Sequence, residues 1–169
     1  MPLHRNYMMD NVKGVLIFLV VVSHFVLFYV QDGVASALTS TFTYYIYSFH
    51  MPLFVFVSGY FSKDVDKARN NAFNTLLVPY ILFNTTMMVV AHTAGLCDLS
   101  LLTPVYVHWY LLALFFWRVL LKDLIRIRFI LFISIITAFV AGFFQDATNF
   151  LALGRTITFL PFFLAGYFT

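Results

Sequence analysis

The chain has 169 residues, of which 62% are hydrophobic, 20% are aromatic and only 10% are charged. A soluble domain of this size has too little interior to cover so many large apolar side chains, so the composition favours a protein embedded in lipid. The net charge of +3 is small, and the basic residues lie between apolar runs. We therefore expect them to set membrane topology rather than to bind nucleic acid. The single cysteine excludes an intramolecular disulfide.

Apolar runs that approach the ~20 residues of a membrane-spanning helix follow one another along the chain. The predicted helices cover residues 14–30, 41–61, 73–94, 104–121, 129–144 and 156–169. The last run is still apolar where the sequence stops, so we expect a single partial membrane domain over residues 1–169, the front part of a longer bundle. The predicted fold class is an all-α, polytopic transmembrane helix bundle.

Lysine and arginine are distributed unevenly between the predicted loops. They precede the first helix and lie between the second and third helices, and four more, Arg118, Lys122, Arg126 and Arg128, lie at or between the ends of the fourth and fifth helices. Segments 31–41 and 93–102 contain none. By the positive-inside rule, the N-terminus is therefore cytoplasmic. Arg155 is the exception, because it precedes the sixth helix on the outer side. A lone basic residue in that place indicates a specific partner.

Two histidines lie inside the first two predicted helices at matching depth. With a rise of ~1.5 Å per residue, His24 lies about 16 Å and His50 about 18 Å above the cytoplasmic face. The imidazoles can therefore face each other or one polar cavity, and Pro52 loosens the helix beside His50. An ionisable residue inside a membrane marks a functional site by default. The structural alternative is a neutral histidine bonded to a serine hydroxyl and a backbone carbonyl.

A neutral imidazole in a polar pocket can act as a general base for an alcohol that attacks an activated acyl group. No G-x-S-x-G sequence, phosphate-binding glycine motif or mid-membrane acid accompanies these histidines. Two histidines are also too few ligands for zinc, so we predict no metal. Acyl transfer and proton relay remain as the candidate chemistries.

Other polar residues each allow a second interpretation. Asp10 and Lys13 stand one turn apart where the first helix enters the membrane and can pair, although Lys13 alone would be a topology signal. Lys67 and Arg69 lie in a basic loop that could bind phosphates or could only reflect the positive-inside bias. Trp109 fits the interfacial aromatic belt, with a substrate platform as the alternative.

Two further histidines, His92 and His108, lie near predicted outer helix ends, where an amphipathic ring is comfortable. We interpret both as interfacial residues rather than as parts of a site.

Five blocks of sequence resemble a known family in order and content. They are DNVKGVLIFLVVVSHF, SFHMPLFVFVSGYF, LLVPYILFN, HWYLLALFFWRVLL and GRTITFLPFFLAGY. Over essentially the whole chain they resemble acyltransferase family 3, and within it the sugar O-acetyltransferases related to fucose 4-O-acetylase. The first block carries a basic residue, ten intervening residues and a histidine, and the other blocks make the resemblance specific.

The resemblance implies a membrane O-acyltransferase that moves an acetyl or other acyl group from cytoplasmic acyl-CoA to a hydroxyl of an extracytoplasmic carbohydrate. It implies no bound cofactor, and it places the protein in a bacterial cytoplasmic membrane. His24 is then the catalytic base, with Lys13 as the basic partner of its motif, and His50 matches the catalytic histidine of the family's second helix. Arg155 and Trp109 are expected to contact the acceptor.

The donor site is expected near Lys13, Asp10, Lys67 and Arg69. Many family members carry a paired-arginine motif just before the proline of the third helix. Here that segment is NAFNTLLVP, without arginine, so the donor contacts fall to Lys67 and Arg69.

Two other functions remain as alternatives. The histidines could form the proton relay of a transporter whose prolines break the helices. The chain could also be an inactive piece of a membrane protein whose polar groups only hold helices together.

Overall fold

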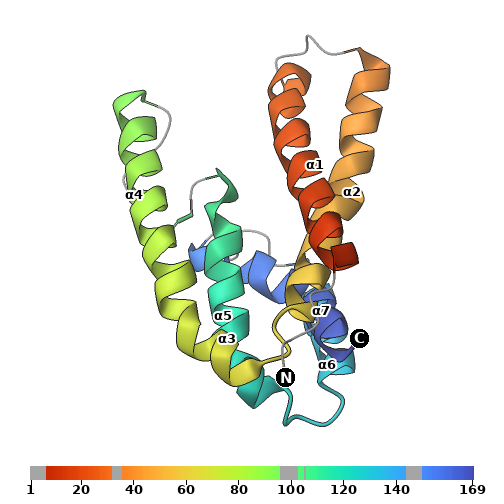
Figure 1. The fold of residues 1–169 in the computed structure, drawn as a ribbon. Coiled ribbons are helices and arrows are strands. Elements are labelled where there is room, and N and C mark those ends of the chain that lie inside the picture. Colours follow the sequence, from red (N-terminus) through yellow and green to blue (C-terminus); the bar gives the residue numbers. More distant parts are fainter. Residues whose placement is uncertain (1–6, 32–35, 96–102, 105, 144–149) are drawn as a thin grey trace.

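The computed structural model describes residues 7–31, 36–95, 103–104, 106–143 and 150–169 (Figure 1). The regular secondary structure within these ranges is entirely helical. The α-helices are α1 (Tyr7–Gln31), α2 (Ala37–Tyr60), α3 (Val65–Ala72), α4 (Val78–Thr93), α5 (Trp109–Leu124), α6 (Ile130–Ala141) and α7 (Leu153–Phe168). The predicted all-α membrane helix bundle is confirmed.

The third predicted helix begins earlier than residue 73. Helix α3 starts at Val65 because the Asp64 carboxylate accepts the backbone N–H of Lys67 at 3.2 Å and caps the first turn. A π-helical turn, Phe73–Leu77, then joins α3 to α4. Pro79 has no N–H to donate and crowds the carbonyl four residues earlier, and a π turn accommodates both effects. The segment with Lys67 and Arg69, expected as a loop, is therefore helical.

The fourth predicted helix is shifted toward the C-terminus. A 3₁₀ turn, Tyr106–His108, leads into α5, which starts at Trp109 rather than at residue 104. The helix continues to Leu124, with Lys122 in its last turn. A cation there interacts favourably with the carbonyl end of the helix dipole, so a charged segment can remain helical.

The helices are arranged around α7 and α5 (Figure 1). Helices α1 and α2 form an antiparallel pair, α7 packs against both α2 and α6, and α3 packs against α5. The core lies where α2, α5 and α7 meet. It includes the buried side chains of Val55 of α2, Trp117 and Leu121 of α5, and Phe163 and Leu164 of α7. Toward the upper end of the view, α4 and the α1–α2 pair stand apart.

Aromatic stacking fixes α5 against α7. The Trp117 and Phe163 rings stack at 5.2 Å between centroids, and Trp109 stacks on Phe159 at 5.5 Å. The Trp117 Nε1–H also donates to the backbone carbonyl of Thr156 at 2.9 Å. These contacts hold the start of α7 beside the start of α5.

Replacing Trp117 with phenylalanine should lower the free energy of unfolding by about 1–3 kcal/mol, since it removes this hydrogen bond and leaves space beside Phe163. The measurement is the thermal unfolding midpoint of the intact gene product in detergent. Phe132→Leu on the exposed face of α6 is the control, and it should leave the midpoint nearly unchanged. Equal midpoints for wild type and Trp117→Phe would contradict the packing role.

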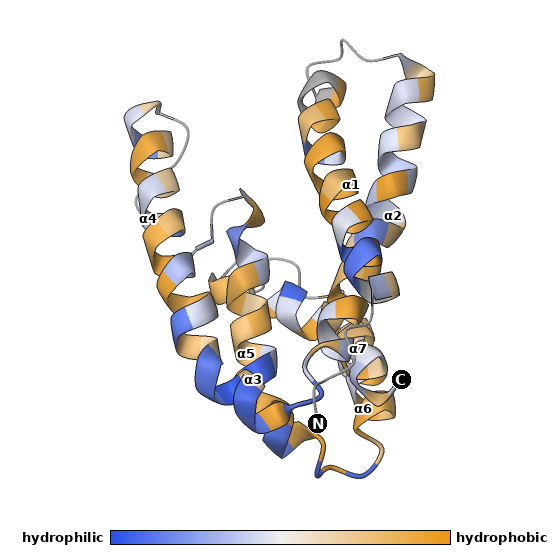
Figure 2. Cartoon of the chain, in the orientation of Figure 1, coloured by the Kyte–Doolittle hydropathy of each residue, from blue (hydrophilic) through white to orange (hydrophobic). Residues whose placement is uncertain are grey.

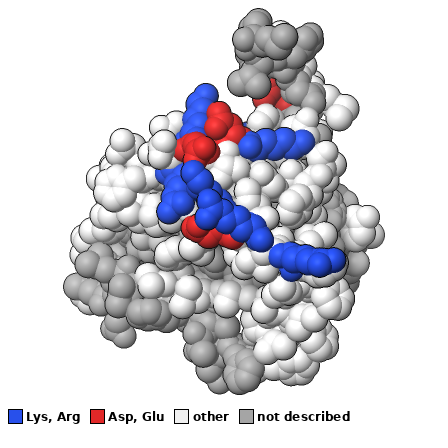
Figure 3. All heavy atoms as spheres, turned by 90° about the horizontal axis from the view of Figure 1, so that it is seen from below, with Lys and Arg blue, Asp and Glu red and all other residues white. Residues whose placement is uncertain are grey.

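Charged residues gather at one end of the bundle, which we call the charged end and which comprises residues 63–69 and 122–128 (Figures 2 and 3). Lys122 Nζ lies 2.6 Å from an Asp66 carboxylate oxygen, and Arg69 lies 3.7 Å from Asp123. All four side chains are at least 41% exposed, so the pairs add little stability, but they do align α3 with the end of α5. The clustering at one end agrees with the uneven distribution of lysine and arginine in the sequence.

The apolar surface of the helices fits a lipid environment. Among the described residues, two helical segments are long and apolar enough to cross a membrane, Asp10–Leu27 and Val65–Thr93. Helices α6 and α7 are apolar but shorter, at 12 and 16 residues. Large side chains such as Phe18, Phe25 and Phe139 are exposed on the outside. Such exposure would be unfavourable in water and is ordinary in a bilayer.

Candidate functional site

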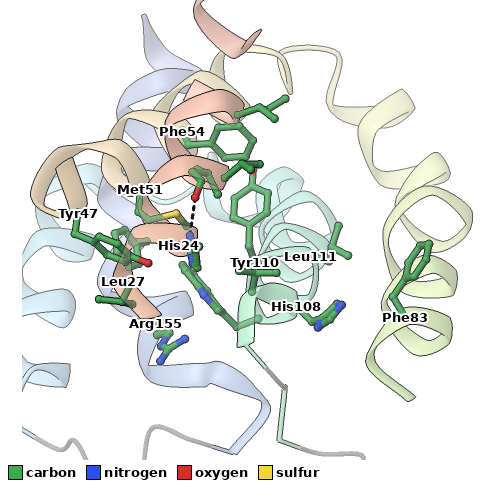
Figure 4. Close-up of a pocket in the computed structure, with 16 residues that line it drawn as sticks. His24, Leu27, Tyr47, Met51, Phe54, Phe83, His108, Tyr110, Leu111 and Arg155 are labelled. Atoms are coloured by element: carbon green, nitrogen blue, oxygen red, sulfur yellow. Dashed lines mark hydrogen bonds between the residues drawn. The ribbon is translucent and has the colours of Figure 1, made fainter. Parts of the chain in front are cut away.

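A cavity of about 730 Å³ lies between α1, α2, α4, the start of α5 and the start of α7 (Figure 4). Most of its wall is apolar. Its polar groups are contributed by His24, Tyr47, His108, Tyr110 and Arg155. A mostly apolar cavity with a few converging polar groups is the usual form of a small-molecule site.

His24 is placed in the cavity wall by α1, and its tautomer is fixed by the helix itself. The Nδ1 atom lies 2.8 Å from the backbone carbonyl of Val20, one turn earlier (Figure 4). Because a carbonyl only accepts, Nδ1 carries the proton in the neutral ring, and Nε2 keeps its lone pair. A lone pair held at a cavity wall is what a general base requires.

His50 lies behind His24 and is fully buried. Its Nδ1 donates in the same way to the carbonyl of Ile46 at 2.8 Å, while its Nε2 has no hydrogen-bond partner. The His24 and His50 rings meet edge-to-face with centroids 6.3 Å apart, which confirms the expected matching depth. His50 is not part of the cavity wall. Any contribution it makes to chemistry in the cavity passes through its neighbours.

Tyr47 links the two histidines. Its ring lies 5.3 Å from that of His24 and 4.8 Å from that of His50, measured between centroids. The buried Tyr47 hydroxyl lies near Ser23 but forms no well-aligned hydrogen bond, and the Ser23 hydroxyl donates to Val20 instead. This pair of buried acceptors, the Tyr47 oxygen and His50 Nε2, is unusual, since buried polar atoms are normally bonded.

The residues expected to contact an acceptor lie on the same cavity. Arg155 places its guanidinium carbon 5.3 Å from the centre of the Trp109 ring, and Phe159 supports that ring from α7. His108, which the sequence analysis interpreted as interfacial, also lines the cavity (Figure 4). Its proximity to Trp109 was the available signal in the sequence. An aromatic face flanked by a guanidinium and an imidazole can hold a polyhydroxylated ring.

The expected donor residues lie away from the cavity. Lys13 is eleven residues, or about 16 Å, from His24 along α1, and its Nζ lies 3.4 Å from the centre of the Phe61 ring. The charge of Lys13 interacts with Asp10. Lys67 is exposed on α3, and Arg69 is engaged with Asp123.

Two features of α5 were not predicted as parts of the site. Tyr110 lines the cavity and shares a hydrogen bond of 2.5 Å with the Ser58 hydroxyl of α2. Arg118, two turns further along α5, interacts electrostatically with both Tyr110 and Lys13. From the sequence, Arg118 is expected only to set membrane topology. In the described part of the chain, no three histidine, cysteine or acidic side chains cluster in a way that could hold a metal ion.

A family model described as an acyltransferase domain, that of acyltransferase family 3, matches residues 6–169. The chain belongs to acyltransferase family 3. The resemblance carried by the five sequence blocks is thereby confirmed, and membership of this membrane-embedded family agrees with the lipid-compatible surface of the helices.

Two family relatives bear the name nodulation protein NolL. The protein of Mesorhizobium japonicum is 28% identical over 136 residues, and that of Sinorhizobium fredii is 31% identical over 144 residues. These matches cover 72% and 76% of this chain but only 36% and 38% of the relatives. The chain thus corresponds to little more than a third of the length of either. No solved structure matches.

Proposed function

We propose that this acyltransferase family 3 chain catalyses the transfer of an acetyl or other acyl group from acyl-CoA to a hydroxyl of a carbohydrate. The observation that carries the proposal is the geometry of His24. Its Nδ1–H is held by the Val20 carbonyl, which leaves the Nε2 lone pair free on a ring that lines the same cavity as Trp109 and Arg155. One cavity thus combines a base that can deprotonate a sugar hydroxyl with an aromatic ring and a cation that can hold the sugar.

The reaction follows from these positions. A sugar bound against Trp109 and Arg155 presents a hydroxyl to His24, and Nε2 accepts its proton as the oxygen attacks the thioester carbonyl carbon. The new C–O bond forms, the C–S bond breaks, and the sulfur leaves as a thiolate. The proton on His24 then passes to this thiolate, which restores the base and releases free CoA. His50 and Tyr47 pack behind His24 and position its ring.

The orientation in the membrane follows from the charged end. We place this end in the cytoplasm of a bacterial cell, with several helices crossing the cytoplasmic membrane. The donor then arrives near Lys13, Asp10, Lys67 and Arg69, while the acceptor reaches the cavity from the other side. Helix α1 carries both Lys13, at the donor site, and His24, in the wall of the acceptor cavity.

The test uses membranes that contain the intact gene product and acetyl-CoA labelled in the acetyl group. We expect label in the glycan fraction and an equal amount of free CoA thiol, and neither in membranes that lack the gene. Flux of a solute driven by a pH gradient, without release of CoA, would contradict the proposal and favour the transporter alternative. Folded protein without either activity would favour the inactive-piece alternative.

A further inference from the structure

Among the residues that the structure describes, no carboxylate forms an ion pair with Arg118. Arg118 lies within the apolar helix α5, is half-buried, and its Nε is buried without a hydrogen-bond partner. Among the described residues, the ion pairs of the charged end involve Lys122 and Arg69 but not Arg118. A guanidinium withdrawn from water is costly unless an anion or a set of acceptors meets it.

A second cation, Lys13, lies close enough to Arg118 for their charges to interact. Lys13 reaches from α1 across the end of α2, where its ammonium group rests on the Phe61 ring, and its charge repels that of Arg118. Asp10 is the carboxylate that offsets Lys13. Among the described residues, two cations with one interacting carboxylate leave a net positive region between α1 and α5. An anionic ligand would relieve both the repulsion and the missing hydrogen bond.

We infer that Arg118, together with Lys13, binds a phosphate group of the acyl donor. This assignment rests on the proposed function and adds Arg118 to its donor site. A guanidinium forms two parallel hydrogen bonds with a phosphate, and the lysine supplies a further charge. The cluster lies toward the charged end, from which a water-soluble donor would approach.

The spacing along the helices defines the kind of donor. Tyr110, in the cavity wall, and Arg118 are eight residues or about 12 Å apart on α5, and His24 and Lys13 are about 16 Å apart on α1. A donor whose phosphate is bound at Arg118 must therefore carry its acyl group on a long arm to reach His24. Acyl-CoA has such an arm between its phosphates and its thioester, whereas acetyl phosphate does not.

The test measures binding of three probes to the intact gene product, reconstituted in phosphatidylcholine vesicles, by equilibrium dialysis. The probes are CoA, dephospho-CoA and pantetheine, which carry successively fewer phosphates. Arg118→Gln should weaken CoA binding about tenfold or more, because a charge-assisted hydrogen bond is lost, and should leave pantetheine binding unchanged. Arg126→Gln, in the exposed turn after α5, is the matched control and should bind CoA as wild type does.

Kinetics separate binding from chemistry. Arg118→Gln should raise KM for acetyl-CoA by a similar factor with little change in kcat, because a phosphate far from the reacting atoms is held equally in the ground and transition states. Arg118→Lys keeps the positive charge but loses the two parallel N–H donors of the guanidinium, so its KM for acetyl-CoA should lie between those of wild type and Arg118→Gln. It also supplies the comparison if Arg118→Gln does not fold.

Each outcome bears on one claim. Wild-type CoA affinity in Arg118→Gln would overturn the assignment of Arg118 and leave the proposed function intact. A wild-type protein that neither binds CoA nor transfers acetyl groups would overturn the proposed function and this donor site with it. A variant effect that appears only when phosphatidylglycerol is added to the vesicles would assign Arg118 to a lipid phosphate and overturn the donor assignment.

Discussion

Replacing His24 with alanine is expected to slow acyl transfer by about 10²–10⁴-fold, the usual contribution of a positioned general base. The reason is geometric. The Val20 carbonyl fixes the proton on Nδ1 of His24, so that Nε2 is ready to accept a proton at the cavity wall. The measurement is the rate of label transfer from acetyl-CoA to glycan in membranes that contain equal amounts of folded wild-type or variant protein.

His108→Ala is the informative control, because His108 lines the same cavity but is placed with the acceptor groups. We expect this variant to raise KM for the acceptor more than it lowers kcat, whereas His24→Ala should lower kcat with little effect on CoA binding. Activity of His24→Ala equal to that of wild type would remove His24 from the role of base. A larger loss of kcat in His108→Ala would transfer the role to that residue.

Gly166→Ala is expected to be strongly destabilising. Helices α2 and α7 cross with their backbones in contact, and a Cβ on Gly166 would lie 1.9 Å from the Phe56 carbonyl oxygen. On the other side of the crossing, a Cβ on Gly59 would lie 2.0 Å from the Phe163 carbonyl oxygen. Backbone atoms cannot move aside as a side chain does, so the helices must separate and the core beside Phe163 must open.

We expect Gly166→Ala or Gly59→Ala to reduce the yield of folded protein sharply, with a loss of about 3 kcal/mol or more in those molecules that fold. The readouts are monodispersity in detergent and the thermal midpoint. Gly14→Ala in α1 is the matched control, since no atom would lie within 4 Å of its new Cβ. Alanine is the better helix former, so this variant should be neutral or slightly more stable. A thermal midpoint for Gly166→Ala equal to that of Gly14→Ala would show that the crossing tolerates a methyl group.

Some parts of the site could be predicted from residue order. The helix rise placed His24 and His50 at one depth, and the structure brings their rings together. The sequence did not show that His24 lines a cavity while His50 is buried behind it, because depth along a helix says nothing about its rotation. That rotation is set by packing on other helices, here by the close crossing of α2 with α7.

Arg118 and Lys67 also show what the sequence does not reveal, namely which of two cations is exposed and which is half-buried near the site. Both are cations near the charged end, and charge alone made Lys67 the candidate for the donor site and Arg118 a topology signal. In the structure Lys67 is exposed on α3, while Arg118 lies half-buried within α5, and its charge interacts with that of Lys13. The difference depends on the helix that carries each residue. Asp64 caps the start of α3, so Lys67 lies in a helix rather than in a loop. The apolar pattern could not reveal this helix, because a short polar helix has no hydrophobic period.

The sequence by itself determined that the protein is embedded in lipid, that it is all-helical, and which family it belongs to. Each of these depends on composition, on apolar runs or on ordered blocks of residues, all of which can be read along one dimension. The tertiary structure decided which polar groups share a space. His24, Trp109 and Arg155 come from three helices far apart in the chain, and they meet because stacked aromatic pairs hold α5 against α7 while α7 also contacts α2. Such contacts depend on side-chain shape at helix crossings, which no local pattern records.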